Sequence, residues 1–414
     1  MIEALLGRFD VSPPVAKAAR AAAARVARIE RPDLERVKAS VLRAFFDEGL
    51  SESDLRESYG YGYDDPARDR YESLLCRIFG AERALARLSL VSGTHAIVTA
   101  LEACLPRGGR LVAATGSPYD TLRNAIADAS YSLVERGIQY DEVSSSADAE
   151  IDPAAVAEAS AGADVVFVQR SRGYAARRAL SAEECGAIAR AVKSVAPQAT
   201  IVVDNCYSEL VEDREPTHYG VDLVAGSLLK NLGGGLAPGG AYVAGRAEIV
   251  ARVAARHYAP GLDANVGPTL GFGRALAQGL FAAPHAVAES LAGLDFFAAL
   301  FEDLGYRADP APGGPRYDIV QAIGLVSADK VAAFARGLQR AMPLNARFRP
   351  EPGPVPGYRD PVVMSSGAFV SGSTLELSCD APMRPPFVAY VQGGMTREHA
   401  MLGALLAAEE TGPS

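Results

Sequence analysis

Lys230 and Asp204 are the residues whose types and surroundings most clearly suggest chemistry. Lys230 lies in the run AGSLLKNLGGGLAPGGAYVAG at residues 225–245, where a small polar residue precedes the lysine and a glycine-rich stretch leads into an apolar pattern typical of a strand. Asp204 ends an earlier apolar run, IVVD. A lysine in a niche that lowers its proton affinity can form a Schiff base with an aldehyde, and a carboxylate can keep a ring nitrogen protonated. The ordinary alternatives are a solvated loop lysine and an N-capping aspartate.

A third element, VSGTHAI at residues 91–97, places Ser92, Gly93 and Thr94 before a helical pattern. Backbone N–H groups at a helix start bind phosphate, Gly93 permits close approach, and the two hydroxyls add donors. A plain N-cap is the alternative for this motif taken alone. Together with Lys230 and Asp204, the motif predicts a site for a phosphorylated aldehyde cofactor, pyridoxal 5'-phosphate (PLP).

A fourth element, TGSPYDT at residues 115–121, puts Tyr119 after Pro118 in a turn that follows a strand pattern. An aromatic side chain at that place can stack on a cofactor ring, while the alternative is a tyrosine that covers the edge of the sheet. A tyrosine held against PLP and cationic groups would have a lowered pKa and could exchange protons near neutral pH.

Parallel strands with crossover helices are the elements expected to position these residues. Short apolar runs alternate with alanine-rich helical segments from about residue 85, which is the pattern of an α/β domain. The predicted strands are LVAAT (111–115), DVVFVQ (164–169), TIVVD (200–204) and AYVAG (241–245). Helices are expected over 15–48 with a break near Pro32, over 286–304 and over 328–341.

Three parts of the chain are expected. With 414 residues, the chain exceeds the size at which one core stops growing. We predict an N-terminal helical arm over 1–64, a large PLP-binding α/β domain over 65–285, and a smaller C-terminal α+β domain over 286–414.

Composition narrows the class of partner and the compartment. The net charge is −9 with no basic block, so nucleic acid and anionic membranes are not expected as partners and a small amino-acid substrate is. The five cysteines are scattered and odd in number, which disfavours a disulfide framework and a zinc cluster. The five histidines lack ligand spacing, so no metal is expected. No run is long enough for a membrane helix and the N-terminus does not resemble a signal peptide, so the cytoplasm is the expected compartment.

The chain as a whole resembles fold-type I PLP enzymes of the cystathionine/methionine γ-lyase superfamily. Within it, the chain is most similar to the branch of the methionine γ-lyase family also known as aluminium resistance proteins. The similarity covers nearly the whole chain. The motifs that carry it, in order, are GYGYDD (60–65), VSGTHAI (91–97), PYDT (118–121), QRSRGY (169–174), VDNCY (203–207), GSLLKN (226–231), GGGLAP (233–238), QGLF (278–281), PHAV (284–287), PGYRDPV (356–362) and QGG (392–394).

The resemblance implies a role for each residue of the predicted site. Lys230 would bind the cofactor covalently and Asp204 would pair with its ring nitrogen. Tyr119 would stack on the ring and assist catalysis. The phosphate would be held by Ser92, Gly93, Thr94 and Ser227.

The chain also departs from the pattern of the better-known lyases. Those enzymes use a Tyr-x-Arg pair to reach the phosphate of a neighbouring subunit. This chain offers Tyr61 and Tyr63, separated by glycine, as the residues expected to bind the cofactor there, and it has no matching arginine. Leu229 replaces the hydroxyl residue expected just before the lysine. An arginine should bind the substrate carboxylate because its planar fork matches that group. The candidates, Arg384, Arg172 and Arg170, remain open, and so does a surface salt bridge for each.

The predicted activity is elimination of a γ-substituent (a thiolate, an O-linked group or a halide) from an L-amino acid through Schiff base and carbanion intermediates. Lys230 would act as general base, and Lys230 with Tyr119 would shuttle the second proton that γ-elimination requires. Alternatives are β-elimination, γ-replacement or aldol-type cleavage on the same scaffold, and a non-catalytic stress or regulatory protein. A homodimer or homotetramer with shared active sites is expected, because a helical arm before the GYGYDD loop is suited to reach a neighbouring subunit.

Overall fold

The structure is a computed structural model that describes residues 1–144 and 150–414. It separates into two compact units, one of Asp33–Pro284 and one that combines Met1–Pro32 with His285–Ser414. The sequence had placed residues 1–64 in a separate arm and the second boundary at residue 285. In the structure the first 32 residues group with the C-terminal segment, and residues 33–64 group with the large α/β unit.

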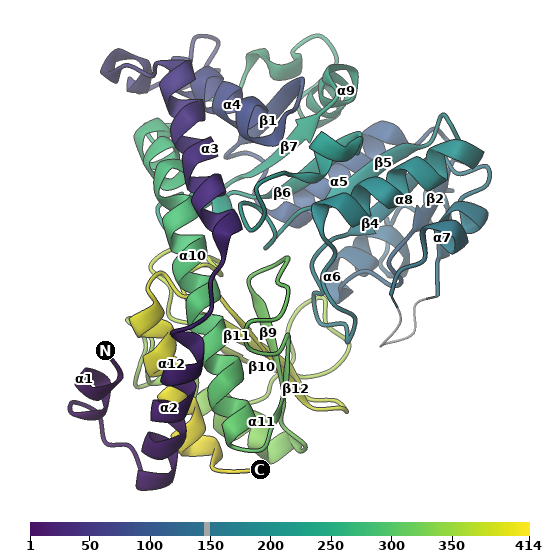
Figure 1. The fold of residues 1–414 in the computed structure, drawn as a ribbon. Coiled ribbons are helices and arrows are strands. Elements are labelled where there is room, and N and C mark those ends of the chain that lie inside the picture. The colour runs from purple at the N-terminus through teal and green to yellow at the C-terminus, as the bar shows by residue number, and fades with distance from the viewer. Residues whose placement is uncertain (145–149) are drawn as a thin grey trace. The chain divides into compact units, whose positions relative to one another are not determined.

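The larger unit is built on a seven-stranded sheet with the order β1-β7-β6-β5-β4-β2-β3 (Figure 1). Every residue of β4, β5, β6 and β7 is buried, as expected for strands covered by helices on both faces. The apolar runs of the sequence therefore form the centre of the sheet. The strands are β1 (Arg83–Arg87), β2 (Arg110–Ala113), β3 (Gln139–Glu142), β4 (Val165–Gln169), β5 (Thr200–Asp204), β6 (Leu223–Ser227) and β7 (Ala241–Gly245).

Four strands predicted from the sequence are present, but one runs in the other direction. The pairs β2–β3, β2–β4, β4–β5 and β5–β6 are parallel, whereas β7 is antiparallel to both β6 and β1. The expectation of a parallel strand at 241–245 is thus wrong. The segment between β6 and β7 contains only a short 3-10 turn, Asn231–Gly233, and a parallel return would need a longer crossover, usually a helix.

Helices of the larger unit begin and end at residues that the sequence marks clearly. The Ser92 side chain caps α5 and the Ser181 side chain caps α8, where Glu184 completes a capping box. The break predicted near Pro32 separates α2 from α3. The helices are α3 (Pro32–Glu48), α4 (Pro66–Phe79), α5 (Gly93–Cys104), α6 (Asp120–Arg123), α7 (Pro153–Ala159), α8 (Ala182–Val195), α9 (Ala247–His257) and α10 (Gly273–Asp303), the last of which continues into the second unit.

The smaller unit contains a five-stranded antiparallel sheet with the order β10-β11-β12-β9-β8. Helices α11 and α12 pack closely, because Gly337 of α11 has no side chain where the backbone of Leu406 approaches: a Cβ there would lie 2.3 Å from the Leu406 oxygen. The predicted α+β character of this region is confirmed. The elements are α1 (Ile2–Leu6), α2 (Pro13–Val26), β8 (Arg307–Asp309), β9 (Val320–Gly324), α11 (Ala328–Gln339), β10 (Val362–Ser365), β11 (Ser378–Pro382), β12 (Val388–Gln392) and α12 (Arg397–Thr411).

Helix lengths and compositions bear on the question of membrane insertion. In the part of the chain that the structure describes, no helix combines the length and apolar character needed to cross a membrane. The longest helix, α10, contains Pro284 and begins at Gly273 rather than at residue 286 as the sequence suggested.

Candidate active site

Lys230 and Asp204 lie at the same edge of the seven-stranded sheet. Asp204 is the last residue of β5, and its register partner on the neighbouring parallel strand β6 is Ala225. Because carboxyl ends of parallel strands meet at one edge, Lys230, three residues beyond Ser227 at the end of β6, follows Asp204 onto that edge. The Lys230 Nζ lies 3.6 Å from the centre of the Tyr207 ring, close enough for a cation–π contact.

The Asp204 carboxylate is buried and held by the chain that follows it. Its Oδ1 accepts a hydrogen bond from the backbone N–H of Cys206 at 3.0 Å. Burial raises the pKa of Asp204 above its ordinary value, and the positive charge of Lys230 and the Cys206 N–H oppose that rise. The carboxylate is therefore in an environment where a cationic partner strongly favours its ionised form.

The pKa of Lys230 differs in direction from the sequence-based expectation. Burial by itself lowers the pKa of this amine, but the surrounding groups, Cys206 and Tyr207 first and Asp204 after them, outweigh burial and raise the pKa well above its ordinary value. The lowered proton affinity was expected for a niche that holds the cofactor and stays a prediction, while in the chain alone the pKa moves in the opposite direction.

The N-terminus of α5 lies against the ends of β5 and β6. A Cβ on Gly93 would lie 2.9 Å from the Cys206 Sγ and 3.4 Å from the Ser227 Cβ, so a glycine is required for this approach. The Ser92 Oγ accepts the backbone N–H of His95 at 3.1 Å, and the Ser227 Oγ accepts that of Leu229 at 3.2 Å. Both hydroxyl groups retain their O–H as a donor. The N-cap and the phosphate interpretations of this motif are therefore compatible.

Tyr119 joins this cluster from the turn before α6. Its hydroxyl group lies 2.9 Å from the Thr94 Oγ1, and its backbone N–H donates to the Gln169 Oε1 at 3.2 Å. Burial raises the pKa of Tyr119 well above its ordinary value, with Asp204 adding to the rise and Lys230 opposing it. The lowered pKa was expected for Tyr119 held against the cofactor and stays a prediction, while in the chain alone the pKa moves in the opposite direction.

Tyr61 and Tyr63 lie at the surface of the larger unit. Their side chains are 74% and 62% exposed, and their ring centres are 5.7 Å apart. Tyr61 lines a cavity of about 460 Å³ together with Arg87 and Tyr258, among others. Their predicted contribution to cofactor binding in a neighbouring subunit remains a prediction.

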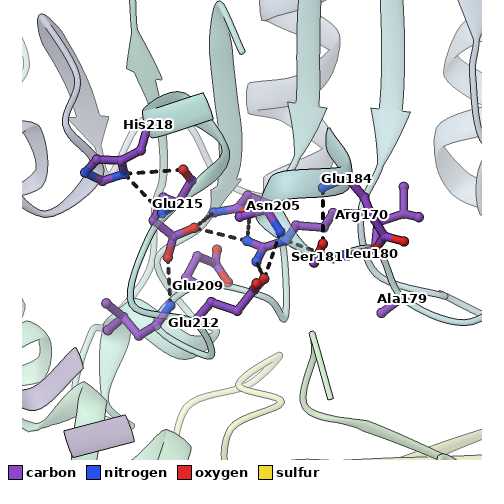
Figure 2. Close-up of polar contacts among 12 residues, drawn as sticks. Arg170, Ala179, Leu180, Ser181, Glu184, Asn205, Glu209, Glu212, Glu215 and His218 are labelled. Carbon is purple, nitrogen blue, oxygen red and sulfur yellow. Dashed lines mark hydrogen bonds and ion pairs between the residues drawn. The ribbon is translucent and has the colours of Figure 1, made fainter. Parts of the chain in front are cut away.

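The Arg170 side chain is buried and bound to other residues of the larger unit. Its guanidinium group is fully buried and forms ion pairs with Glu212 and, at 3.1 Å, with Glu215, as Figure 2 shows. It also donates to the Asn205 Oδ1 at 2.6 Å and to the Leu180 carbonyl at 3.2 Å. With four acceptors already bound, Arg170 is the least suited of the three predicted arginines to receive a substrate carboxylate.

The other two predicted arginines occupy different units. Arg172 is almost fully buried in the loop that follows β4. Arg384 belongs to the smaller unit, where it forms an ion pair with Asp360 at 2.7 Å and is partly exposed. Both remain candidates for the substrate carboxylate.

Three residues that the sequence analysis did not single out also shape the site. Tyr207 supports the Lys230 amine, Cys206 lies between Asp204 and Gly93, and Gln169 positions the backbone of Tyr119. These residues belong to the motifs VDNCY and QRSRGY, which the chain shares with the family it resembles. That shared position was the signal in the sequence that could have identified them. Their contacts, including the positive φ of 71° at Tyr207, depend on the folded chain.

A mostly parallel seven-stranded sheet and an antiparallel sheet in the C-terminal unit give the chain the fold of the fold-type I PLP-dependent enzymes. The methionine gamma-lyase family model matches residues 14–411, and the chain belongs to that family.

The chain is also similar to individual proteins over most of its length. It is 41% identical over 370 residues, 88% of each chain, to the uncharacterized protein YnbB of Bacillus subtilis strain 168. A solved structure of a candidate cystathionine beta-lyase involved in aluminum resistance from Clostridium acetobutylicum is 36% identical, with a TM-score of 0.92 and coverage of 99% of this chain and 98% of that one. A carbon-sulfur lyase involved in aluminum resistance from Clostridium novyi NT is 35% identical, with a TM-score of 0.91 and 98% of both chains covered.

Proposed function

We propose that this protein is a PLP-dependent carbon–sulfur lyase that eliminates a γ-substituent from an L-amino acid. The observation that carries the proposal is the meeting of Lys230, Asp204 and Tyr119 with the N-terminus of α5 at one sheet edge. Family membership supports the lyase class, and the resemblance to methionine γ-lyases favours γ-elimination.

The residues present fit the cofactor. A buried carboxylate beside a buried amine suits a protonated ring nitrogen and a carbonyl group, respectively. Gly93 lets the N-terminus of α5 approach Cys206 and Ser227 closely, and its backbone N–H groups would bind the phosphate, with Ser92, Thr94 and Ser227 as further donors. Lys230, Asp204 and Tyr119 would hold the cofactor ring. The phosphate would be held by Ser92, Gly93, Thr94 and Ser227.

When bound, the cofactor would supply an electron sink for negative charge at the substrate Cα. Asp204 would keep that sink positively charged, because its buried carboxylate favours a cation beside it. With Asp204 paired to this second partner, one of the groups that raise the pKa of Lys230, together with Cys206 and Tyr207, would act on it less, and the amine would accept a proton from the substrate more readily.

Tyr119 would provide the second proton-transfer group that γ-elimination needs. Its raised pKa keeps the hydroxyl protonated at neutral pH, so it can donate to a leaving group while Lys230 moves protons at Cα and Cβ. Thr94 orients that hydroxyl from 2.9 Å. The leaving group would be a thiolate, an O-linked group or a halide.

Elimination at Cβ is the second candidate, because the Clostridium acetobutylicum relative is described as a candidate cystathionine beta-lyase. It would use Lys230 alone as base.

We also propose that Arg172 or Arg384 binds the substrate carboxylate, that the protein acts in the cytoplasm, and that a homodimer or homotetramer shares Tyr61 and Tyr63 across subunits. Light scattering of the purified protein tests the assembly, and Arg→Lys variants that raise KM identify the arginine.

The first test is a visible spectrum of the purified protein before and after borohydride, with peptide mapping of the reduced cofactor. Incubation with matched γ- and β-substituted amino acids, scored for 2-oxo acid, ammonia and released leaving group, then separates the two eliminations. We expect a reducible absorbance located on Lys230 and release from γ-substituted substrates. Release only from β-substituted substrates supports the second candidate, and absence of a reducible absorbance refutes the cofactor assignment.

A further inference from the structure

The turn that follows β5 holds the segment that carries Lys230. The Asn231 side-chain amide, next to Lys230, donates to the backbone oxygens of Tyr207 at 3.0 Å and Glu209 at 2.8 Å. The Tyr207 ring lies against the Lys230 amine. A shift of this turn would therefore move both the lysine and the ring that supports it.

The Glu209 side chain anchors the turn to the sheet. The Tyr242 hydroxyl of β7 donates to the Glu209 Oε1 at 3.0 Å. On β6, a Cβ at Gly226 would lie 2.6 Å from the same oxygen, so a larger residue there would displace the carboxyl group. Glu209 is fully buried, and the contact with β6 lies one residue before Ser227. The side chain thus fills the space between the turn and two strands.

The carboxyl group of Glu209 has an incomplete set of hydrogen bonds. Among the described residues, its Oε2 has no hydrogen-bonding partner although it is buried, which is costly for an ionised carboxylate. Figure 2 shows Glu209 within the cluster that contains Glu215 and Arg170. Burial raises the pKa of Glu209 to about 8, with Glu215 adding to the rise and Lys230 opposing it. The titratable groups that interact electrostatically with Glu209 are Tyr71 of α4, Cys206 and Glu215 of the segment after β5, Lys230, and Tyr242 of β7.

We propose that Glu209 is a positioning residue that fixes Lys230 by bracing the 205–210 turn against β6 and β7. It acts through the ring of Tyr207 and the side chain of Asn231. In its neutral form at pH 7, it adds no negative charge to the surroundings of Lys230. The inference rests on the proposed covalent attachment of PLP at Lys230.

The first experiment measures how fast added PLP becomes attached to Lys230 in apoprotein at pH 7, from the growth of the borohydride-reducible absorbance. Glu209→Gln keeps a neutral group of the same shape and should react at the wild-type rate. Glu209→Ala removes the brace and should react about 10- to 100-fold more slowly, as small misplacements of a reacting group do. Tyr71→Phe is the matched control, because it removes a buried hydroxyl without a described hydrogen-bonding partner and should leave the rate unchanged.

The second experiment needs no cofactor. The folded-state pKa of Glu209, about 8, lies above the ordinary value of 4.5, so the folded protein retains a proton that the unfolded chain releases between those pH values. Stability contributed by this group is therefore complete below pH 4.5 and is lost as pH rises toward 8. The melting temperature of wild-type apoprotein should fall relative to that of Glu209→Gln over this window.

The outcomes separate the inference from the proposed function. If wild-type protein attaches no PLP at Lys230, the proposed function fails, and with it the role in positioning. If wild-type protein attaches PLP and Glu209→Ala reacts equally fast, or Glu209→Gln is as slow as Glu209→Ala, the inference alone is overturned. Should Glu209→Ala fail to fold, Tyr242→Phe decides, since it removes the hydrogen bond that holds the carboxyl group and should slow attachment. If the difference in melting temperature between wild type and Glu209→Gln did not change with pH, Glu209 would not be neutral in the folded protein at pH 7.

Discussion

Replacing Gly93 by alanine should weaken cofactor binding because a single methyl group would enter a tightly packed contact in the site. The new Cβ would lie 2.9 Å from the Cys206 Sγ and 3.4 Å from the Ser227 Cβ. Ordinary contacts between such atoms are about 3.5–4.0 Å. Either α5 moves away from the ends of β5 and β6, or the cysteine side chain is displaced. In both cases the phosphate donors at the α5 N-terminus are shifted.

The size of the effect follows from the cost of overpacking. Adding a methyl group to a well-packed interior costs about 1–3 kcal/mol. If this strain is released by moving the donors, the dissociation constant of PLP rises by about 5- to 150-fold, since about 1.4 kcal/mol corresponds to tenfold. Cys206→Ala in the same chain removes the atom in closest contact and should recover most of the loss.

The assay is equilibrium titration of apoprotein with PLP, followed by absorbance, for the two single variants and the double variant. The double-mutant cycle isolates the coupling between Gly93 and Cys206. Gly239→Ala is the matched control, because a Cβ there meets nothing within 4 Å and its φ is not positive. Circular dichroism confirms that each variant is folded before titration.

Two results would refute the reasoning. A Gly93→Ala dissociation constant equal to that of wild type would show that α5 can absorb the methyl group without moving the phosphate donors. A loss of affinity in Gly93→Ala that is unchanged by Cys206→Ala would show that the sulfur contact is not its source. Weakening in Gly239→Ala of similar size would point to a general effect of alanine in these loops.

Four further predictions address other parts of the molecule. Lys230→Ala should lose the borohydride-reducible absorbance and turnover while its circular dichroism spectrum stays that of wild type; a retained reducible absorbance would contradict the assignment. Asp204→Asn should still bind PLP in a titration but lose about 100-fold or more in kcat, the scale of a lost electrostatic stabiliser. Arg170→Met should lower the free energy of unfolding by about 3–5 kcal/mol in urea titration, because it leaves buried carboxylates uncompensated; an effect no larger than that of exposed Arg43→Met would oppose this. Burial and neighbouring cations lower the pKa of His257 to about 4 from 6.5, so its contribution to stability is complete above pH 6.5 and is lost as pH falls toward 4, and His257→Asn should flatten that part of a melting-temperature profile.

Much of the fold could be predicted because it depends on local patterns. Buried strands β4, β5 and β7 appear as apolar runs, and Ser92 marks the start of α5 as a short-range capping signal. The direction of β7 could not be read in the same way. An apolar run specifies burial, whereas strand direction depends on the connection before it, and the glycine-rich segment after Lys230 forms no crossover helix.

The division of the chain also depended on long-range contacts. Helices α2 and α3 were expected to belong to one arm, yet they belong to different units. In the unit with the C-terminal segment, Arg31 pairs with the buried Asp295 at 2.7 Å, and the Asp295 carboxylate also accepts from Arg316 at 2.9 Å. Arg31 and Asp295 are more than 250 residues apart in the sequence. Helical periodicity alone therefore contains no information about their contact.

The sequence by itself determined the reactive groups: an amine at Lys230, a carboxylate at Asp204, a phenol at Tyr119 and a helix start at Gly93, in an order typical of one family. Only the tertiary structure decided their protonation and their partners. Cys206, Tyr207 and Asp204 raise the pKa of Lys230 in the chain alone, and carboxylates occupy Arg170, a candidate for substrate binding. The physical reason is that pKa values and ion pairs depend on burial and on distances between charges, which folding sets among residues far apart in the chain.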